Sequence, residues 1–327
     1  MRSGRRGVAL PGLVMAGLIA CLGAALPRAA AAQQVGDTAF VWEVPRPAFP
    51  AGEGPRVLVD EAHGNFHTVS GRFAPFARLL RADGFVVDGL SEDFTAETLA
   101  DADLLVIANA LHPDNEEEWS LPTPSAFSTG EMDAVEAWVE EGGALLLIAD
   151  HMPFPGAAEE LAARFDFEMN NGFAMDTASP GPFVFRRSDG SLAEHPITSG
   201  WSPDEAVDSV TTFTGQAFRA PGNARTLLTL RDGIVSFVPD VAWEFSAETP
   251  TVDVGGWSQG AVVDVGRGRV AIFGEAAMFT AQRTGDGAPM GMNAPMAGDN
   301  PRFVLNLVRW LAGEPRGRRG SAGPPLG

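Results

Sequence analysis

The fold is decided at residues 55–67, which read PRVLVDEAHGNFH. Their apolar run, Val57–Val59, predicts a short strand, and a continuous apolar run is typical of a strand buried on both faces. Residues 72–83 then predict an amphipathic helix that ends before Gly84. A buried strand followed by a helix is the unit from which α/β folds are built.

The same alternation of apolar runs and helical segments continues toward the C-terminus. Strands are expected at 85–87, 104–107, 145–148, 261–265 and 270–273, and helices at about 131–141, 157–165 and 301–311. Ser128 and Glu131 form a capping box for one of these helices. Residues 167–260 differ, because their many Gly, Pro, Asp and Thr residues predict antiparallel strands and loops. We therefore expect a three-layer α/β/α sandwich with a mostly parallel central sheet and an antiparallel β-rich insertion.

Residues 1–32 have the layout of a secretory signal peptide. Three early arginines precede an apolar stretch from Val8 to Leu26, and Ala29–Ala32 supply small residues for cleavage near Ala32. This predicts a periplasmic or secreted protein. The sole cysteine, Cys21, offers the alternative of a lipoprotein signal. On the first interpretation the mature chain has no thiol for disulfides, catalysis or metal binding.

The rest of the chain divides by composition. Residues 33–54 are rich in Pro, Gly and Ala and are expected to be a linker, residues 55–312 one α/β domain, and residues 313–327 a disordered tail. No later apolar stretch is long enough to span a membrane.

Charge and composition exclude several kinds of function. The net charge is −19 and becomes −23 without residues 1–32, which hold four arginines and no acid. Such acidity argues against nucleic acid as a partner and against adhesion to anionic lipid. The chain has no Lys and no Tyr, which removes Schiff-base, P-loop and tyrosine chemistry. It also lacks the Gly-x-Ser-x-Gly elbow of common serine hydrolases and a Gly-rich dinucleotide fingerprint after Val59.

Polar side chains gather where the predicted strands end. Ligands of open α/β sheets bind at that edge, so segments far apart in sequence are expected to meet there. Four of the five histidines lie on these strand-end loops. The residues are Asp60, Glu61, His63, Asn65 and His67, then Asn109 and His112, then Asp150 and His151, and finally Glu275.

Three interpretations of this edge stay open. It is an acid–base site with His63, Glu61, His151 and Glu275 as catalytic groups, or a divalent metal site for zinc, iron or manganese. The third is a structural or small-ligand site. The metal ligands would be His63, His67, His112 and His151. The ligand-binding residues would be Asp60, Asn65, His67, Asn109, His112 and Asp150.

The tryptophans of the β-rich part have two interpretations. Trp201, Trp243 and Trp257 lie among predicted strands and loops. Core packing is the first interpretation, and stacking on sugar rings is the second.

Four stretches carry a resemblance to a known group of proteins. They are VLVDEAH at 57–63, EHPIT at 194–198, GRVAIFGE at 268–275, and DNP at 299–301 leading to LNLVRWL at 305–311. Together they resemble the class I glutamine amidotransferase-like superfamily, which has a flavodoxin-like fold. The most similar branch is the uncharacterised bacterial one akin to the domains of gliding-motility and intraflagellar-transport proteins.

The amidotransferases of this superfamily use a Cys–His–Glu triad. Since the mature chain offers no cysteine, the resemblance implies neither glutaminase nor cysteine-protease chemistry. It favours an exported domain that binds a small molecule, a glycan or a cell-envelope protein at the carboxyl edge of the sheet. The alternative is a periplasmic hydrolase with a His/Asp/Glu site, with or without a metal.

Overall fold

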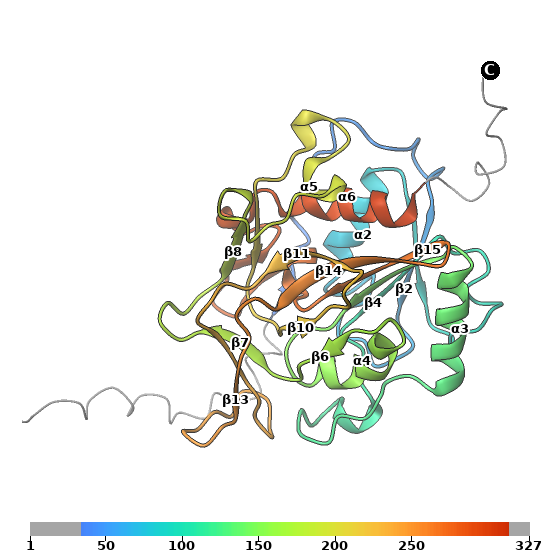
Figure 1. Ribbon diagram of the computed structural model, residues 1–327. Coiled ribbons are helices and arrows are strands. Elements are labelled where there is room, and N and C mark those ends of the chain that lie inside the picture. Colours follow the sequence, from blue (N-terminus) through green and yellow to red (C-terminus); the bar gives the residue numbers. More distant parts are fainter. Residues whose placement is uncertain (1–33, 314–327) are drawn as a thin grey trace, which may run out of the picture. The chain divides into compact units, whose positions relative to one another are not determined.

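The computed structural model describes residues 34–313 (Figure 1). The expected signal peptide, the lipoprotein alternative at Cys21 and nearly all of the expected tail lie outside the described residues. Within residues 34–313, no helix combines the length and the apolar character needed to cross a bilayer.

One half of the central nine-stranded sheet is parallel. The strand order is β3 (Val86–Leu90), β2 (Arg56–Asp60), β4 (Leu104–Ala108), β5 (Ala144–Ile148) and β15 (Gly268–Phe273), and each neighbouring pair is parallel. Every residue of β4 and β5 is buried, as the continuous apolar runs predicted. The α/β fold is therefore confirmed.

The other half of the sheet is antiparallel. It consists of β14 (Ser258–Val265), β11 (Arg225–Thr229), β10 (Phe218–Arg219) and β6 (Glu168–Met169). Strands β6, β10 and β11 come from residues 167–260, which we expected as an insertion, and most of β14 is the strand expected at 261–265. Part of this region extends the central sheet instead, because β14 pairs with β15 along its length.

The remaining strands form three small sheets. They are β7 (Phe173–Asp176) with β12 (Ile234–Phe237) and β13 (Thr251–Asp253), β8 (Phe183–Arg186) with β9 (Ser209–Thr212), and β1 (Val35–Gly36) with β16 (Ala281–Arg283) and β17 (Pro289–Gly291). The short helices are η1 (Pro113–Asn115), η2 (Arg187–Asp189), α5 (Pro196–Ser199), η3 (Pro203–Glu205), η4 (Ala277–Phe279) and η5 (Pro295–Ala297).

Two helices cover each face of the parallel half. Helices α2 (Ala74–Ala82) and α6 (Asn300–Ala312) share one apolar core with the sheet, and α3 (Thr129–Glu140) and α4 (Phe154–Ala163) share the other (Figure 1). Successive residues of a strand alternate between the cores, so Leu146 faces the first and Leu147 the second. This is the expected three-layer sandwich.

Residues 34–54, expected as a linker, are packed against the domain. Strand β1 pairs with β16, and Phe40, Trp42 and Phe49 lie against the first core. Asp37 is buried and accepts a hydrogen bond from Asn293. The Pro and Gly residues of this segment thus shape an ordered path over the surface.

Candidate functional site

The register of the parallel strands brings the predicted residues to one edge. Ile148 of β5 lies opposite Ala108 of β4 and Phe273 of β15. The residues that follow these strands therefore leave the sheet at the same level. The polar side chains there divide into two groups, one around His63 and the other around His151.

His63 follows β2, and both of its ring nitrogens contact carboxylates. Nδ1 lies 2.8 Å from Oδ1 of Asp60, and Nε2 lies 2.7 Å from Oε1 of Glu131. Asn65 donates from its amide to Oδ2 of Asp60 at 2.9 Å and accepts from the backbone N–H of His63 at 3.0 Å. The strand-end loop is thus locked by its own polar side chains.

The two carboxylates control the charge of His63. Phe94 and Phe127 lie against the ring, with centroids 4.6 and 4.9 Å away. Burial alone would lower the pKa of His63, but hydrogen bonds and charge from Asp60 and Glu131 outweigh it and raise the pKa. The protonated ring is held between two acids and has no free lone pair, so it is unsuited to act as a general base in this state.

Glu131 is a site residue that the sequence identified only as a helix cap. Its side chain accepts from the backbone N–H of Ser128 at 3.0 Å and completes the predicted capping box of α3. Burial acts to raise the pKa of Glu131, but the bonds from Ser128 and His63 outweigh it, and the pKa is lowered. Helices of α/β units begin at the carboxyl edge of the sheet, so the capping box could have indicated that Glu131 lies at this edge.

His151 is the centre of the second group. Its Nδ1 lies 2.8 Å from the backbone carbonyl of Met152, which can only accept. A neutral ring therefore carries its proton on Nδ1 and its lone pair on Nε2. The ring stacks on Phe173 with centroids 4.6 Å apart, and it forms a T-shaped pair with Trp243, whose centroid is 4.7 Å away.

Trp243 is 46% exposed, and its backbone adopts φ 68°. A positive φ is strained for a bulky side chain and costs on the order of 1–3 kcal/mol. The strain is maintained by pairing between two loops, in which Ala242 donates to the carbonyl of Trp119 and Leu121 donates to that of Asp240, both at 2.8 Å. Trp119 lies 6.0 Å from His151. Two loops thus each bring one indole to the same histidine.

Behind His151 lies a buried polar network. Asp150 accepts from the backbone N–H of His151 at 2.8 Å and from the hydroxyl of Thr214 at 3.1 Å. Asn109 adopts φ 53° and accepts from the backbone N–H of Asp150 at 2.9 Å. These bonds make Asp150 and Asn109 supports for the loop that carries His151.

Glu275 ends β15 and is fully buried. Its carboxylate accepts from the backbone N–H groups of Ala277 at 3.0 Å and Met278 at 2.7 Å, and so caps η4. Burial and the nearby charge of Asp150 raise the pKa of Glu275 well above its usual value. The capping alternative thus accounts for the bonds to Ala277 and Met278, and a further backbone bond comes from Phe213.

Three other predicted residues have separate surroundings. Glu61 accepts from the backbone N–H of Val69 at 2.7 Å, and His112 caps η1 by accepting from that of Asp114 at 3.2 Å. His67 is buried against Phe73, and neither of its ring nitrogens has a hydrogen-bond partner within residues 34–313. Burial, with a contribution from Arg72, lowers the pKa of His67 to about 3.

The four histidines expected to ligate a metal do not form one site. Within residues 34–313, one set of three potential metal ligands has its donor atoms within 4.8 Å of one another. Of the four histidines, only His63 belongs to this set. His63 and His67 are four residues apart, but the segment between them is not helical, so their side chains need not share a direction, and His67 is buried against Phe73.

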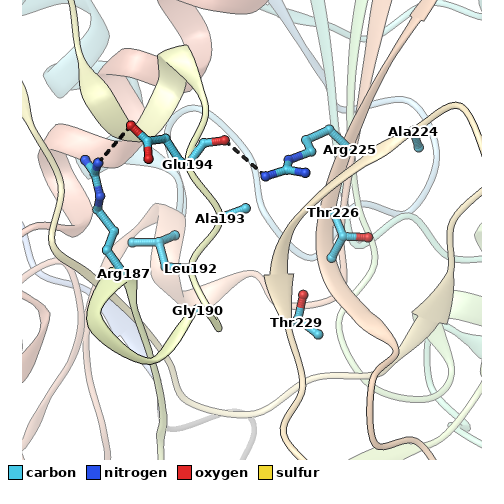
Figure 2. Close-up of a pocket in the computed structure, with 9 residues that line it drawn as sticks. All are labelled: Arg187, Gly190, Leu192, Ala193, Glu194, Ala224, Arg225, Thr226 and Thr229. Atoms are coloured by element: carbon cyan, nitrogen blue, oxygen red, sulfur yellow. Dashed lines mark hydrogen bonds and ion pairs between the residues drawn. The ribbon is translucent and has the colours of Figure 1, made fainter.

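A pocket of about 590 Å³ lies away from this edge, between residues 187–194 and β11. Figure 2 shows Arg187 directed at the carboxylate of Glu194, 3.4 Å away, and Arg225 reaching the backbone carbonyl of the same residue at 3.3 Å. None of the predicted site residues lines this pocket.

No protein-family model and no curated protein sequence matches the chain. Among solved structures, the N-terminal domain of mmIFT52 is similar with a TM-score of 0.54 and 13% identity, over 79% of this chain and 97% of that one. A putative ThuA-like protein from Bacteroides uniformis has a TM-score of 0.46 and 14% identity, over 81% of this chain and 94% of that one. A cytoplasmic protein of Salmonella typhimurium has a TM-score of 0.46 and 13% identity, over 79% and 98%.

These similarities concern the fold. The first of them confirms, at that level, the expected likeness to an intraflagellar-transport domain. Identities this low carry no information about the activity of the chain, which rests on its own side chains.

Proposed function

We propose that the chain is an exported domain that binds a glycan or a similar small polar molecule at the carboxyl edge of its sheet, around His151. The observation that carries this proposal is the half-exposed, strained Trp243 held against His151 by two paired loops. Strain in a loop persists only where the surroundings fix it, and it concentrates at functional sites.

The chemistry of this group suits a sugar. An exposed indole face stacks on the apolar face of a sugar ring, while polar groups of the protein select its hydroxyls. His151 with Nδ1 committed to Met152 presents Nε2 as an acceptor for one hydroxyl. The acidic chain suits a neutral ligand better than an anionic one.

Membership of the glutamine amidotransferase-like superfamily belongs to the same proposal. The motifs at residues 57–63 and 268–275 and the α/β fold support it. Export is supported by the arginines and apolar stretch of residues 1–32. Cell fractionation of the natural chain and of a Cys21→Ser variant tests export and separates a cleaved soluble form from a lipoprotein.

Binding is tested by tryptophan fluorescence titrated with soluble cello-, malto-, chito- and galacto-oligosaccharides. We expect a saturable change with at least one series, weakened at least tenfold in Trp243→Ala. Trp201→Ala is the matched control, because Trp201 is 61% exposed but belongs to another loop. A flat titration with all four series, or equal weakening in both variants, contradicts the proposal.

A hydrolase is the second candidate, and the 2.8 Å contact between His63 and Asp60 favours it. A carboxylate that orients an imidazole is a recurrent part of acid–base sites, and the protonated ring of His63 would serve there as the general acid. Hydrolysis of 4-nitrophenyl esters and glycosides, lost in His63→Gln and retained in Trp243→Ala, would support this function. Equal rates for the natural chain and His63→Gln would exclude it.

A further inference from the structure

His63, Glu131 and Asp93 bring three potential ligand atoms together from three parts of the chain. The ring nitrogen of His63 and one carboxylate oxygen from each acid all lie within 4.8 Å of one another. His63 follows β2, Asp93 lies in the loop after β3, and Glu131 begins α3. We propose that this group is a binding site for a divalent cation of the zinc or manganese type, independent of the glycan site.

The surroundings of His63 fit a ligand better than a simple ion pair. Buried Asp60 contacts Nδ1 at 2.8 Å, and Asn65 donates to the other oxygen of Asp60. A carboxylate on the far nitrogen is the usual second layer around a metal-bound imidazole, because it fixes the ring and directs Nε2 at the cation. Here Nε2 points at Glu131.

The charge of the group also favours a cation. Asp60, Asp93 and Glu131 supply three carboxylates around one imidazole. Asp60 and Glu131 each form an ion pair with His63. Within residues 34–313, neither acid is paired with an arginine. A divalent cation that replaces the proton shared by His63 and Glu131 would leave the group with one negative charge less.

The exposed side of this group leaves room for the cation to enter and leave, and for water molecules to bind it. His63 is buried and Glu131 largely so, whereas Asp93 is exposed at the rim. One imidazole and two carboxylates with an open side suit Zn²⁺ or Mn²⁺, whose remaining positions are then taken by water. Ca²⁺ prefers six to eight oxygen ligands and is expected to bind poorly.

The test is calorimetric titration of the untagged chain with ZnCl₂, MnCl₂ and CaCl₂. We expect one Zn²⁺ or Mn²⁺ per chain and little heat from Ca²⁺. Asp93→Asn should weaken binding at least tenfold. Glu92→Gln is the matched control, because it removes a neighbouring exposed acid of the same charge and should leave affinity unchanged.

Two further controls separate metal binding from folding and from the proposed glycan site. Asp93 is exposed, so Asp93→Asn should keep the unfolding midpoint of the metal-free protein, and Trp243→Ala should bind the metal as the natural chain does. The absence of saturable Zn²⁺ and Mn²⁺ binding at millimolar concentration overturns the site. Equal weakening by Asp93→Asn and Glu92→Gln also overturns it, since binding would then follow surface charge alone.

Discussion

Replacing His67 by leucine should make the protein more stable, and more so in acid. At neutral pH the imidazole has one N–H and one lone pair, and neither finds a partner in the described part of the chain. An unsatisfied buried polar group costs about 1–3 kcal/mol, and a hydrophobic replacement of similar volume costs less than about 1.5 kcal/mol. We therefore expect His67→Leu to raise the free energy of unfolding by about 1 kcal/mol at pH 7.5.

The gain should increase as the pH falls. The pKa of His67 is about 3 in the folded chain and near 6.5 when unfolded, so between these values the unfolded state binds the extra proton. Such a group lowers stability as the pH decreases through 6.5. At pH 5 this amounts to about 2 kcal/mol, since one pKa unit corresponds to about 1.4 kcal/mol. The leucine variant lacks this loss.

Urea unfolding followed by tryptophan fluorescence at pH 7.5 and 5.0 measures both effects. The difference between variant and natural chain should grow from about 1 to about 3 kcal/mol. Phe303→Leu is the control, because Phe303 is buried in the same core and its ring packs on Phe273, so its cost should be the same at both pH values. A gain that does not change with pH, or a loss at both values, would refute the reasoning.

The remaining predictions concern single contacts, each measured by thermal or urea unfolding. Arg309→Met should cost about 3–5 kcal/mol, because it leaves buried Asp83 without the guanidinium that binds it at 2.7 Å; a loss below 1 kcal/mol would contradict this. Gly130→Ala in α3 should stabilise by up to about 1 kcal/mol, since the new methyl meets nothing within 4 Å. Gly268→Ala should fold poorly, because its methyl would lie 2.1 Å from the backbone oxygens of Gly143 and Val139; native-like stability would show that the hairpin can shift.

Local signals predicted most of the parallel half of the fold. Ser128 and Glu131 fixed the start of α3, and the apolar runs fixed β4 and β5, because capping and burial depend on adjacent residues. In the antiparallel half, the strand at 261–265 was predicted and is most of β14, but β11, β10 and β6 were not predicted as part of the central sheet. Strands β10 and β6 have only two residues each, and their pairing is set by distant segments rather than by their own pattern.

In the candidate site too, contacts within one loop could be predicted from the sequence, whereas contacts between distant segments could not. Asp60, His63 and Asn65 lie within one loop, so their mutual contacts follow from proximity in sequence. Glu131 reaches His63 from 68 residues away, and its contact depends on how α3 packs. The position of Trp243 depends on two loops pairing, which no local pattern encodes.

That loop pairing bears on the order in which the molecule assembles. Leu121 and Asp240 are joined by a backbone hydrogen bond although they lie more than a hundred residues apart in the chain. Closing a loop of this length costs entropy, but the parallel half carries the same cost, because β5 and β15 pair across a comparable separation in the chain. The rim therefore has no entropic disadvantage over the sheet below it. We expect the ligand site and the hydrophobic interior to be regained in the same cooperative step of refolding.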